Sequence, residues 1–156
     1  MRVQRHGVGV DVPRGWDVRV YLRRDTGDGV STTHSVLHAA NFALPAQRGD
    51  YGSGAVERMG SGHVFVSLVE FHPDAAKTAL FKKRGIPKLS PASFSPRKLQ
   101  RTLPGQGGSQ FFFNHKGRAF CLFVVLGSYG NRVRLVRKAN ELVAALHIDD
   151  LPKSAP

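Results

Sequence analysis

A glycine-bearing loop followed by arginines is the pattern in this sequence that most directly suggests a binding site. Residues 127–131 (Gly-Ser-Tyr-Gly-Asn) follow an apolar run, and Arg132 and Arg134 open the helical pattern that comes next. Backbone N–H groups at a helix start, with guanidinium groups beside them, bind phosphates and carboxylates. This interpretation predicts an anion site with the two arginines as donors. A tight strand-to-helix turn whose arginines extend into water is the alternative.

Positive charge is concentrated in one stretch of the chain. The protein has 156 residues and a formal net charge of +12, and residues 75–140 hold 14 Lys and Arg but no Asp or Glu. Unpaired like charges repel, so this stretch favours a surface for an acidic protein or a nucleic acid. A solvated basic face on an arginine-rich protein is the alternative. The candidate anion- or partner-binding residues are Arg97, Lys98, Arg101, Arg118, Arg132, Arg134, Arg137 and Lys138.

The last helix carries its charges against its own dipole. Its four cations fall in the N-terminal half, where the dipole is positive, and the acidic residues Glu141, Asp149 and Asp150 follow towards the other end. Each misplaced charge near a helix end is expected to cost ~0.3–1 kcal/mol. This arrangement supports the interpretation that the cations meet an anion.

No catalytic or metal-binding set emerges from residue spacing. His34 and His38 lie four apart, but no carboxylate or third histidine is spaced to complete a metal site. Glu70 and Asp74 are a possible acid–base pair, although Asp74 fits better as a helix cap. We therefore expect no catalytic residues, no metal and no cofactor. A deep polar pocket holding His34, His38 or His63 would instead favour an enzyme.

Composition and length limit the class of protein. Hydrophobic residues at 41% and charged residues at 22% are typical of a soluble globular chain. We expect one domain over residues 1–148 and a flexible tail over residues 149–156. No apolar run reaches the ~18–20 residues of a membrane-spanning helix, and the first residues do not resemble a secretory signal. A single cysteine excludes an internal disulfide. These features predict a cytoplasmic protein.

Alternation of apolar residues predicts several strands. The expected strands cover Val8–Val12, Trp16–Leu22, Ser35–Leu44, His63–Phe71, Gln110–Phe113 and Ala119–Leu126. The last of these is apolar on both faces, so we expect a central strand that is covered on both sides. The phenylalanines at positions 111–113 are expected to supply core plus one exposed ring, which is a candidate protein interface.

Three helices are expected in the second half of the chain. The first covers Ala75–Arg84 with Asp74 as its cap, and a short one follows Ser95-Pro96 towards Leu103. The third covers about Asn131–His147 and has an apolar stripe. Together these elements predict an α+β sandwich: an antiparallel, hairpin-rich sheet of about five to six strands packed by the C-terminal helix and one or two short helices.

The layout resembles the PsbP-like superfamily. The resemblance rests on Pro13, Gly15 and Trp16 in the Pro-x-Gly-Trp pattern, on the run of hairpins, and on a final strand pair followed by a packing helix. That superfamily includes photosystem extrinsic subunits, a Ran-binding adaptor and lipoproteins of actinobacteria. The resemblance implies a non-catalytic accessory fold that acts by docking a partner.

The function predicted from the sequence is that of a non-enzymatic accessory module. It docks an acidic protein or another polyanion through a basic face built from residues 75–140. The first alternative is a nucleic-acid-binding protein that uses the same face for phosphate contacts without reading base sequence. The second alternative is an enzyme of unknown class, for which the sequence supplies no set of nucleophile, base and orienting group.

Overall fold

The fold is seen in a computed structural model that describes residues 1–26 and 29–150. The 3-10 helices named in the described part of the chain are η2 (Val56–Arg58), η3 (Pro73–Lys77), η4 (Ala79–Phe81), η5 (Pro91–Ser93) and η6 (Tyr129–Asn131). The strands are β1 (Arg2–Arg5), β2 (Val8–Asp11), β3 (Asp17–Asp25), β4 (Thr32–Ala40), β5 (Val64–Phe71), β6 (Gly107–His115), β7 (Arg118–Leu126) and β8 (Leu146–Ile148), and the α-helix is α1 (Arg132–Ala144).

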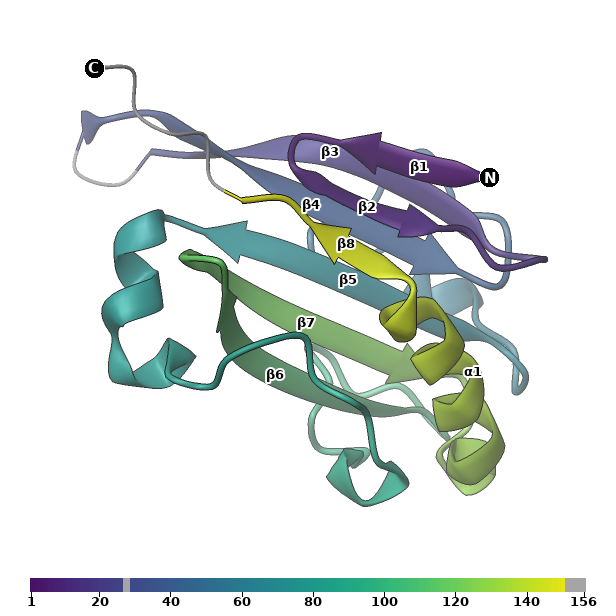
Figure 1. The fold of residues 1–156 in the computed structure, drawn as a ribbon. Helices are drawn as coiled ribbons and strands as arrows, with labels where there is room; N and C mark the ends of the chain where they lie inside the picture. The colour runs from purple at the N-terminus through teal and green to yellow at the C-terminus, as the bar shows by residue number, and fades with distance from the viewer. Residues whose placement is uncertain (27–28, 151–156) are drawn as a thin grey trace.

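The strands form two antiparallel sheets. The larger has the order β3-β4-β5-β7-β6, and the smaller has the order β1-β2-β8. The smaller sheet and α1 pack on the same side of the larger sheet (Figure 1). The expected α+β class is confirmed, with the strands divided between two sheets.

Strand β7 is the centre of the core. All nine of its residues are buried, as its two apolar faces predicted. On one face Leu122 and Val124 belong to the main core with α1 and the smaller sheet. On the other face Phe123 and Val125 pack with Phe65 in a second cluster. Burying a large apolar side chain contributes ~1.5–3 kcal/mol, so this double coverage makes β7 the most strongly anchored strand.

The expected helix over Ala75–Arg84 is wrong. The chain instead forms two 3-10 helices, η3 (Pro73–Lys77) and η4 (Ala79–Phe81), separated by an extended Thr78. The Thr78 hydroxyl donates to the carbonyl of Ala75, at 2.7 Å, and so replaces a helical backbone bond. The cap is also different, because Nδ1 of His72 accepts from the backbone of Asp74.

The short helix expected after Ser95-Pro96 does not form either. Ser95 pairs with Gly108 of β6 through two backbone hydrogen bonds of 3.0 Å. Its hydroxyl accepts from the backbone N–H of Arg97, at 3.1 Å, which closes a turn rather than a helix. The same Ser-Pro pattern does begin a 3-10 helix at η5 (Pro91–Ser93), where Ser90 is the cap.

The last helix is shorter than expected. Its apolar stripe is buried as predicted, but α1 ends at Ala144, and Leu146–Ile148 form β8. Strand β8 pairs antiparallel with β2, which joins the end of the chain to its beginning. Strand β6 is longer than expected, β4 ends earlier, and β1 was not predicted.

Part of the expected tail lies within the described residues. The backbone N–H of Asp149 donates to the carbonyl of Gly7 at 2.9 Å, and its carboxylate accepts from the amide of Gln4 at 2.8 Å. Residues 151–156 of that tail lie outside the described residues.

Candidate partner-binding surface

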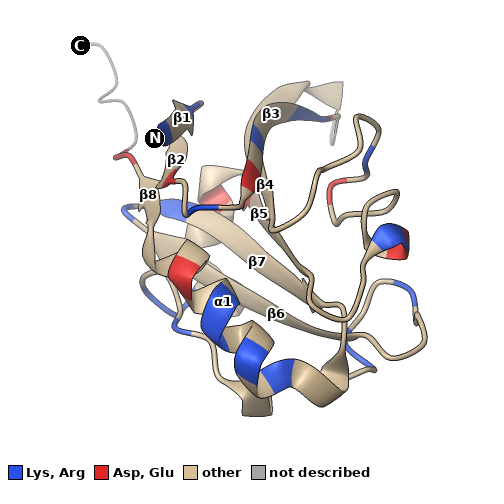
Figure 2. Cartoon of the chain, turned by 90° about the vertical axis from the view of Figure 1, so that its right-hand side faces the viewer, with Lys and Arg blue, Asp and Glu red and all other residues tan. Residues whose placement is uncertain are grey.

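Basic residues occur at several positions along α1, where the ribbon is blue in Figure 2. Arg134 and Arg137 are exposed, and Lys138 is half-buried. Arg132 behaves differently, because its guanidinium lies 4.4 Å from the Tyr129 ring centroid and donates to the carbonyl of the same residue at 3.1 Å. This contact places the positive charge of Arg132 beside the turn that precedes the helix. The Arg132 side chain therefore packs on the turn before the helix, whereas Arg134 and Arg137 are exposed. The anion site at Arg132 and Arg134 stays a prediction.

The basic residues around position 100 lie elsewhere on the molecule. Lys98 donates to the carbonyl of Ser93 at 3.1 Å, and Arg101 lies 3.8 Å from the carboxylate of Glu57. Arg97 is exposed. Leu99, which lies between Lys98 and Arg101 in sequence, packs against the second core cluster on the face of the large sheet opposite α1. The predicted basic face is therefore spread over more than one side of the fold.

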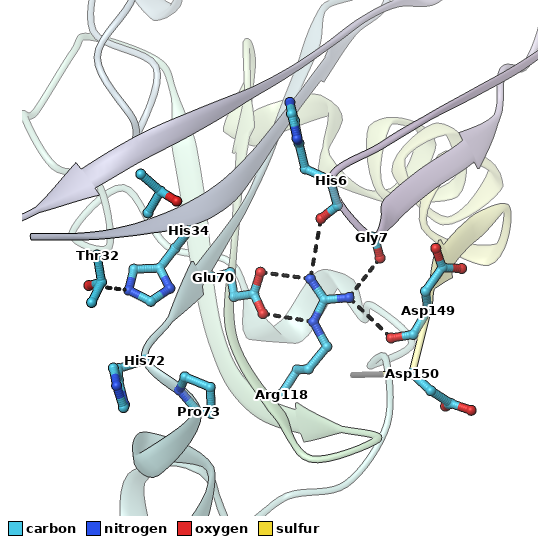
Figure 3. Close-up of a pocket in the computed structure, with 11 residues that line it drawn as sticks. His6, Gly7, Thr32, His34, Glu70, His72, Pro73, Arg118, Asp149 and Asp150 are labelled. Atoms are coloured by element: carbon cyan, nitrogen blue, oxygen red, sulfur yellow. Dashed lines mark hydrogen bonds and ion pairs between the residues drawn. The ribbon is translucent and has the colours of Figure 1, made fainter. Parts of the chain in front are cut away.

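Arg118 is not a surface residue. Its side chain is only 6% exposed, and it pairs with both carboxylate oxygens of Glu70, at 2.7 Å each. The remaining N–H groups donate to the carbonyls of His6, Gly7 and Asp149 (Figure 3). An arginine has five N–H donors, and these five bonds use all of them. The prediction that Arg118 joins an exposed basic face is corrected, because the side chain instead ties both ends of the chain to the large sheet.

Glu70 completes this buried ion pair. The Ser35 hydroxyl also donates to it, at 2.8 Å. Burial by itself would raise the pKa of Glu70, but hydrogen bonds from Arg118 and Ser35 and the charge of Arg118 outweigh it. The pKa therefore falls below its ordinary value of 4.5. Glu70 is ionised at neutral pH, and its geometry suits a fixed counter-ion better than a general acid.

A cavity of about 580 Å³ opens beside this ion pair and contains His34 and His72. Burial, and secondarily the charge of Arg23, lowers the pKa of His34, so its imidazole is neutral at pH 7. Its Nε2 lies 3.0 Å from the hydroxyl of Thr32. This is a hydroxyl beside a base, and among the described residues no further side chain hydrogen-bonds to the imidazole to orient it. Within the same residues no cluster of three or more metal-ligating side chains occurs.

A second cavity, here called the edge groove, is basic. It has a volume of about 480 Å³ and is lined by residues 79–80, 82–88, 93 and 110–113. No acidic residue lines it, and none of its four cations forms an ion pair with a described residue. Phe111 and Phe112, both half-buried, form part of its wall, and Leu80 is 59% exposed at its rim. The four cations are Lys82, Lys83, Arg84 and Lys88.

Asn114, near the end of β6, positions three of these cations. Its backbone N–H donates to the carbonyl of Lys83, and its carbonyl accepts from the N–H of Gly85, both at 2.8 Å. Its side-chain amide donates to the carbonyls of Phe81 and Lys83. Gly85 has φ +84°, a left-handed conformation that suits glycine and turns the chain away at this point. The run of residues 82–84 is therefore held against the edge of the large sheet.

The fourth cation lies on a segment that α1 holds. The side chain of Asn140 accepts from the N–H of Leu89 and donates to its carbonyl, both at 2.9 Å. Lys88 immediately precedes this clamp. The clamp draws the segment towards the helix and keeps the groove open beside β6.

The sequence contains both patterns that form the edge groove, which are the cations at 82–84 and the phenylalanines at 111–113, but neither pattern predicts a groove. The three cations at 82–84 end the helix expected over Ala75–Arg84, which does not form. The phenylalanine run was expected to expose one ring. All three phenylalanines line the groove, but Phe113 is buried in the core, whereas Phe111 and Phe112 are half-buried. The pairing of Asn114 with Lys83 and Gly85 and the contact of the Phe81 ring with Phe112 bring the two patterns together.

Comparisons with known proteins identified no relative of this chain. No helix in the described part of the chain has the length and apolar character needed to cross a membrane. The resemblance to the PsbP-like superfamily stays a prediction. No family model, curated protein or solved structure matches this chain.

Proposed function

We propose that this chain is a binding module that docks an acidic polypeptide partner, with the edge groove as the contact site. The observation that carries the proposal is the cluster of four cations, which form no ion pair with any described residue, beside the half-buried Phe111 and Phe112. Close like charges destabilise the free protein, and an acidic partner relieves that repulsion. Aromatic and cationic side chains around one hollow are also typical of residues that dominate binding energy. The cytoplasmic location stays part of this proposal.

The proposal predicts that removing groove charge weakens binding more than removing charge elsewhere. Labelled poly-L-glutamate serves as the acidic probe, and its affinity is measured by fluorescence anisotropy. The variant K83E/R84E should bind at least about tenfold more weakly than the wild type, which corresponds to ~1.4 kcal/mol. The variant R5E/R14E makes the same change in net charge at exposed residues far from the groove in sequence, and it should stay within about twofold.

Two outcomes contradict the proposal. Equal losses in the two variants would mean that the probe responds only to net charge. Failure of the wild type to bind the probe at low salt would remove the docking function altogether.

A second candidate function is binding to the phosphate backbone of nucleic acid. It is favoured by the exposed Arg134 and Arg137 on α1, together with Lys138. Binding of a thymidine oligonucleotide should then weaken log-linearly with salt, and R134E/R137E should reduce the slope. Retention of the oligonucleotide with no retention of poly-L-glutamate would favour this candidate over the first.

A further inference from the structure

The edge groove follows the outer edge of β6, which is the last strand of the large sheet. On its inner side β6 pairs with β7 along all nine residues, without a break in register. On its outer side, the described part of the chain pairs with β6 only near its two ends. Gly108 pairs with Ser95, and Asn114 pairs with the chain around Arg84.

In the middle of this edge, backbone N–H and C=O groups have no backbone hydrogen-bond partner among the described residues. Gly108 and Asn114 both direct their N–H and C=O groups outward, as their bonds to Ser95, Lys83 and Gly85 show. In an antiparallel strand the direction of these groups alternates from residue to residue. Gln110 and Phe112 have the same parity, so their backbone groups also face outward. Among the described residues no backbone group bonds to them there.

We propose that an acidic segment of the partner binds in extended form as an added strand along β6, opposite Gln110 and Phe112. This inference rests on the proposed function and specifies the conformation of the partner. The two outward residues offer two donors and two acceptors, a pattern that an extended peptide matches with its own main chain. The distance from Gly108 to Asn114 is about 20 Å at ~3.4 Å per residue, which leaves room for roughly five residues.

The charge of the groove selects the occupant. Lys82, Lys83, Arg84 and Lys88 surround the open edge, and no carboxylate lines it. In a symmetric pair of β6 strands, these cations would face their own copies and repel them. A nucleic acid would meet the cations but lacks the alternating N–H and C=O groups that match a strand edge. An acidic peptide satisfies both the charges and the backbone.

The test removes one outward N–H while leaving the sheet intact. Gln110→Pro eliminates the N–H that faces the groove, and the β6–β7 ladder does not use that group, so the strand can tolerate proline there. Gln110→Ala is the matched control, because it removes the side chain and keeps the N–H. The probe is a labelled peptide that alternates Glu and Val. Q110P should bind it at least about tenfold more weakly than Q110A. The Tm of both variants establishes that they are folded.

A second measurement changes the peptide instead of the protein. One version carries N-methyl groups on its Glu residues and another on its Val residues, so charge and side chains are preserved. Only alternate N–H groups of an added strand face β6. One methylated version should therefore lose at least about tenfold in affinity while the other binds like the parent. This asymmetry is not expected from charge attraction alone.

The outcomes separate this inference from the proposed function. If Q110P and Q110A bind alike and both methylated peptides bind like the parent, strand addition is wrong. The effect of K83E/R84E on poly-L-glutamate then still decides the docking function by itself. If the parent peptide fails to bind the wild type, strand addition is also wrong. A dimer that dissociates in Q110P would assign the edge to a second copy of the chain.

Discussion

Replacing Arg118 with methionine should be strongly destabilising. The substitution removes five hydrogen bonds and leaves the carboxylate of Glu70 buried without its cation. Breaking one side of a buried ion pair costs ~3–5 kcal/mol, because the remaining charge has lost water and gains nothing in return. Domains of this size typically unfold at a cost of ~5–15 kcal/mol, so the loss is a large fraction of the total.

The pH dependence gives a sharper measurement of the same effect. In the wild type the pKa of Glu70 lies below 4.5, so its contribution is present above that pH and is lost as the pH falls through the folded pKa. In R118M the lowering contributions from Arg118 disappear, so that only the hydrogen bonds from Ser35 oppose burial, which is the largest single contribution and raises the pKa of Glu70. The folded variant then binds a proton more readily than the unfolded chain. The contribution of Glu70 to the free energy of unfolding then becomes unfavourable as the pH rises, which is opposite in sign to its contribution in the wild type.

Urea unfolding between about pH 4 and pH 7, followed by far-UV circular dichroism, measures both effects. The double variant R118M/E70Q is the control, because a neutral amide replaces the stranded charge. It should recover about 2 kcal/mol of the loss in R118M at neutral pH. A loss in R118M below about 1 kcal/mol, of the size found for exposed pairs, together with an unchanged pH slope, would show that the pair has no structural role.

Two further predictions concern His38 and Asn140. Burial lowers the pKa of His38 to about 4 from 6.5, and its ring nitrogens already contact the carbonyl of Asp50 and the guanidinium of Arg48. As the pH falls, the unfolded chain binds a proton at His38 before the folded protein does. The free energy of unfolding should therefore fall by up to about 3 kcal/mol between pH 6.5 and pH 4. The urea midpoint of H38Q should change less with pH than that of the wild type. Asn140→Ala removes both bonds to the backbone of Leu89 and should cost about 2 kcal/mol. Asn140→Asp keeps the acceptor but places a carboxylate oxygen against the Leu89 carbonyl, so it should cost at least as much, and thermal unfolding compares the two variants. A lower cost for Asn140→Asp would mean that the bond donated to the Leu89 carbonyl contributes little.

The strands with strong local patterns were predicted well. Strand β7 is apolar at nearly every position, and only a central strand buries both faces of such a run. The stripe on α1 likewise predicted the residues that face the core. In these segments, side-chain hydrophobicity by itself selects the element, because the free energy of burial exceeds the difference in backbone preference.

The weaker elements depend on partners far away in the chain. Strand β1 has Val3 among polar residues, and it exists because β2 pairs with it across a tight turn. Leu146 continues the helical stripe in sequence, yet it lies in β8 because Val10 of β2 supplies a pairing partner. Around Ala75 the local pattern favoured a helix, but Thr78 and the bonds from Asn114 interrupt it. The free-energy difference that comes from local helix propensity is smaller than the contribution of these tertiary contacts.

The sequence alone established that the excess of positive charge lies in residues 75–140, with no Asp or Glu among them. It did not indicate which of those cations share a surface. Arg118 pairs with the carboxylate of Glu70, 48 positions away, and is buried. Asn114 instead holds Lys83 and Arg84 against the outer edge of β6. Charge is a property of each residue, but the neighbours of a charge are set by long-range pairing. For that reason the basic character was readable from the chain, and the groove appeared only when the fold brought the segments together.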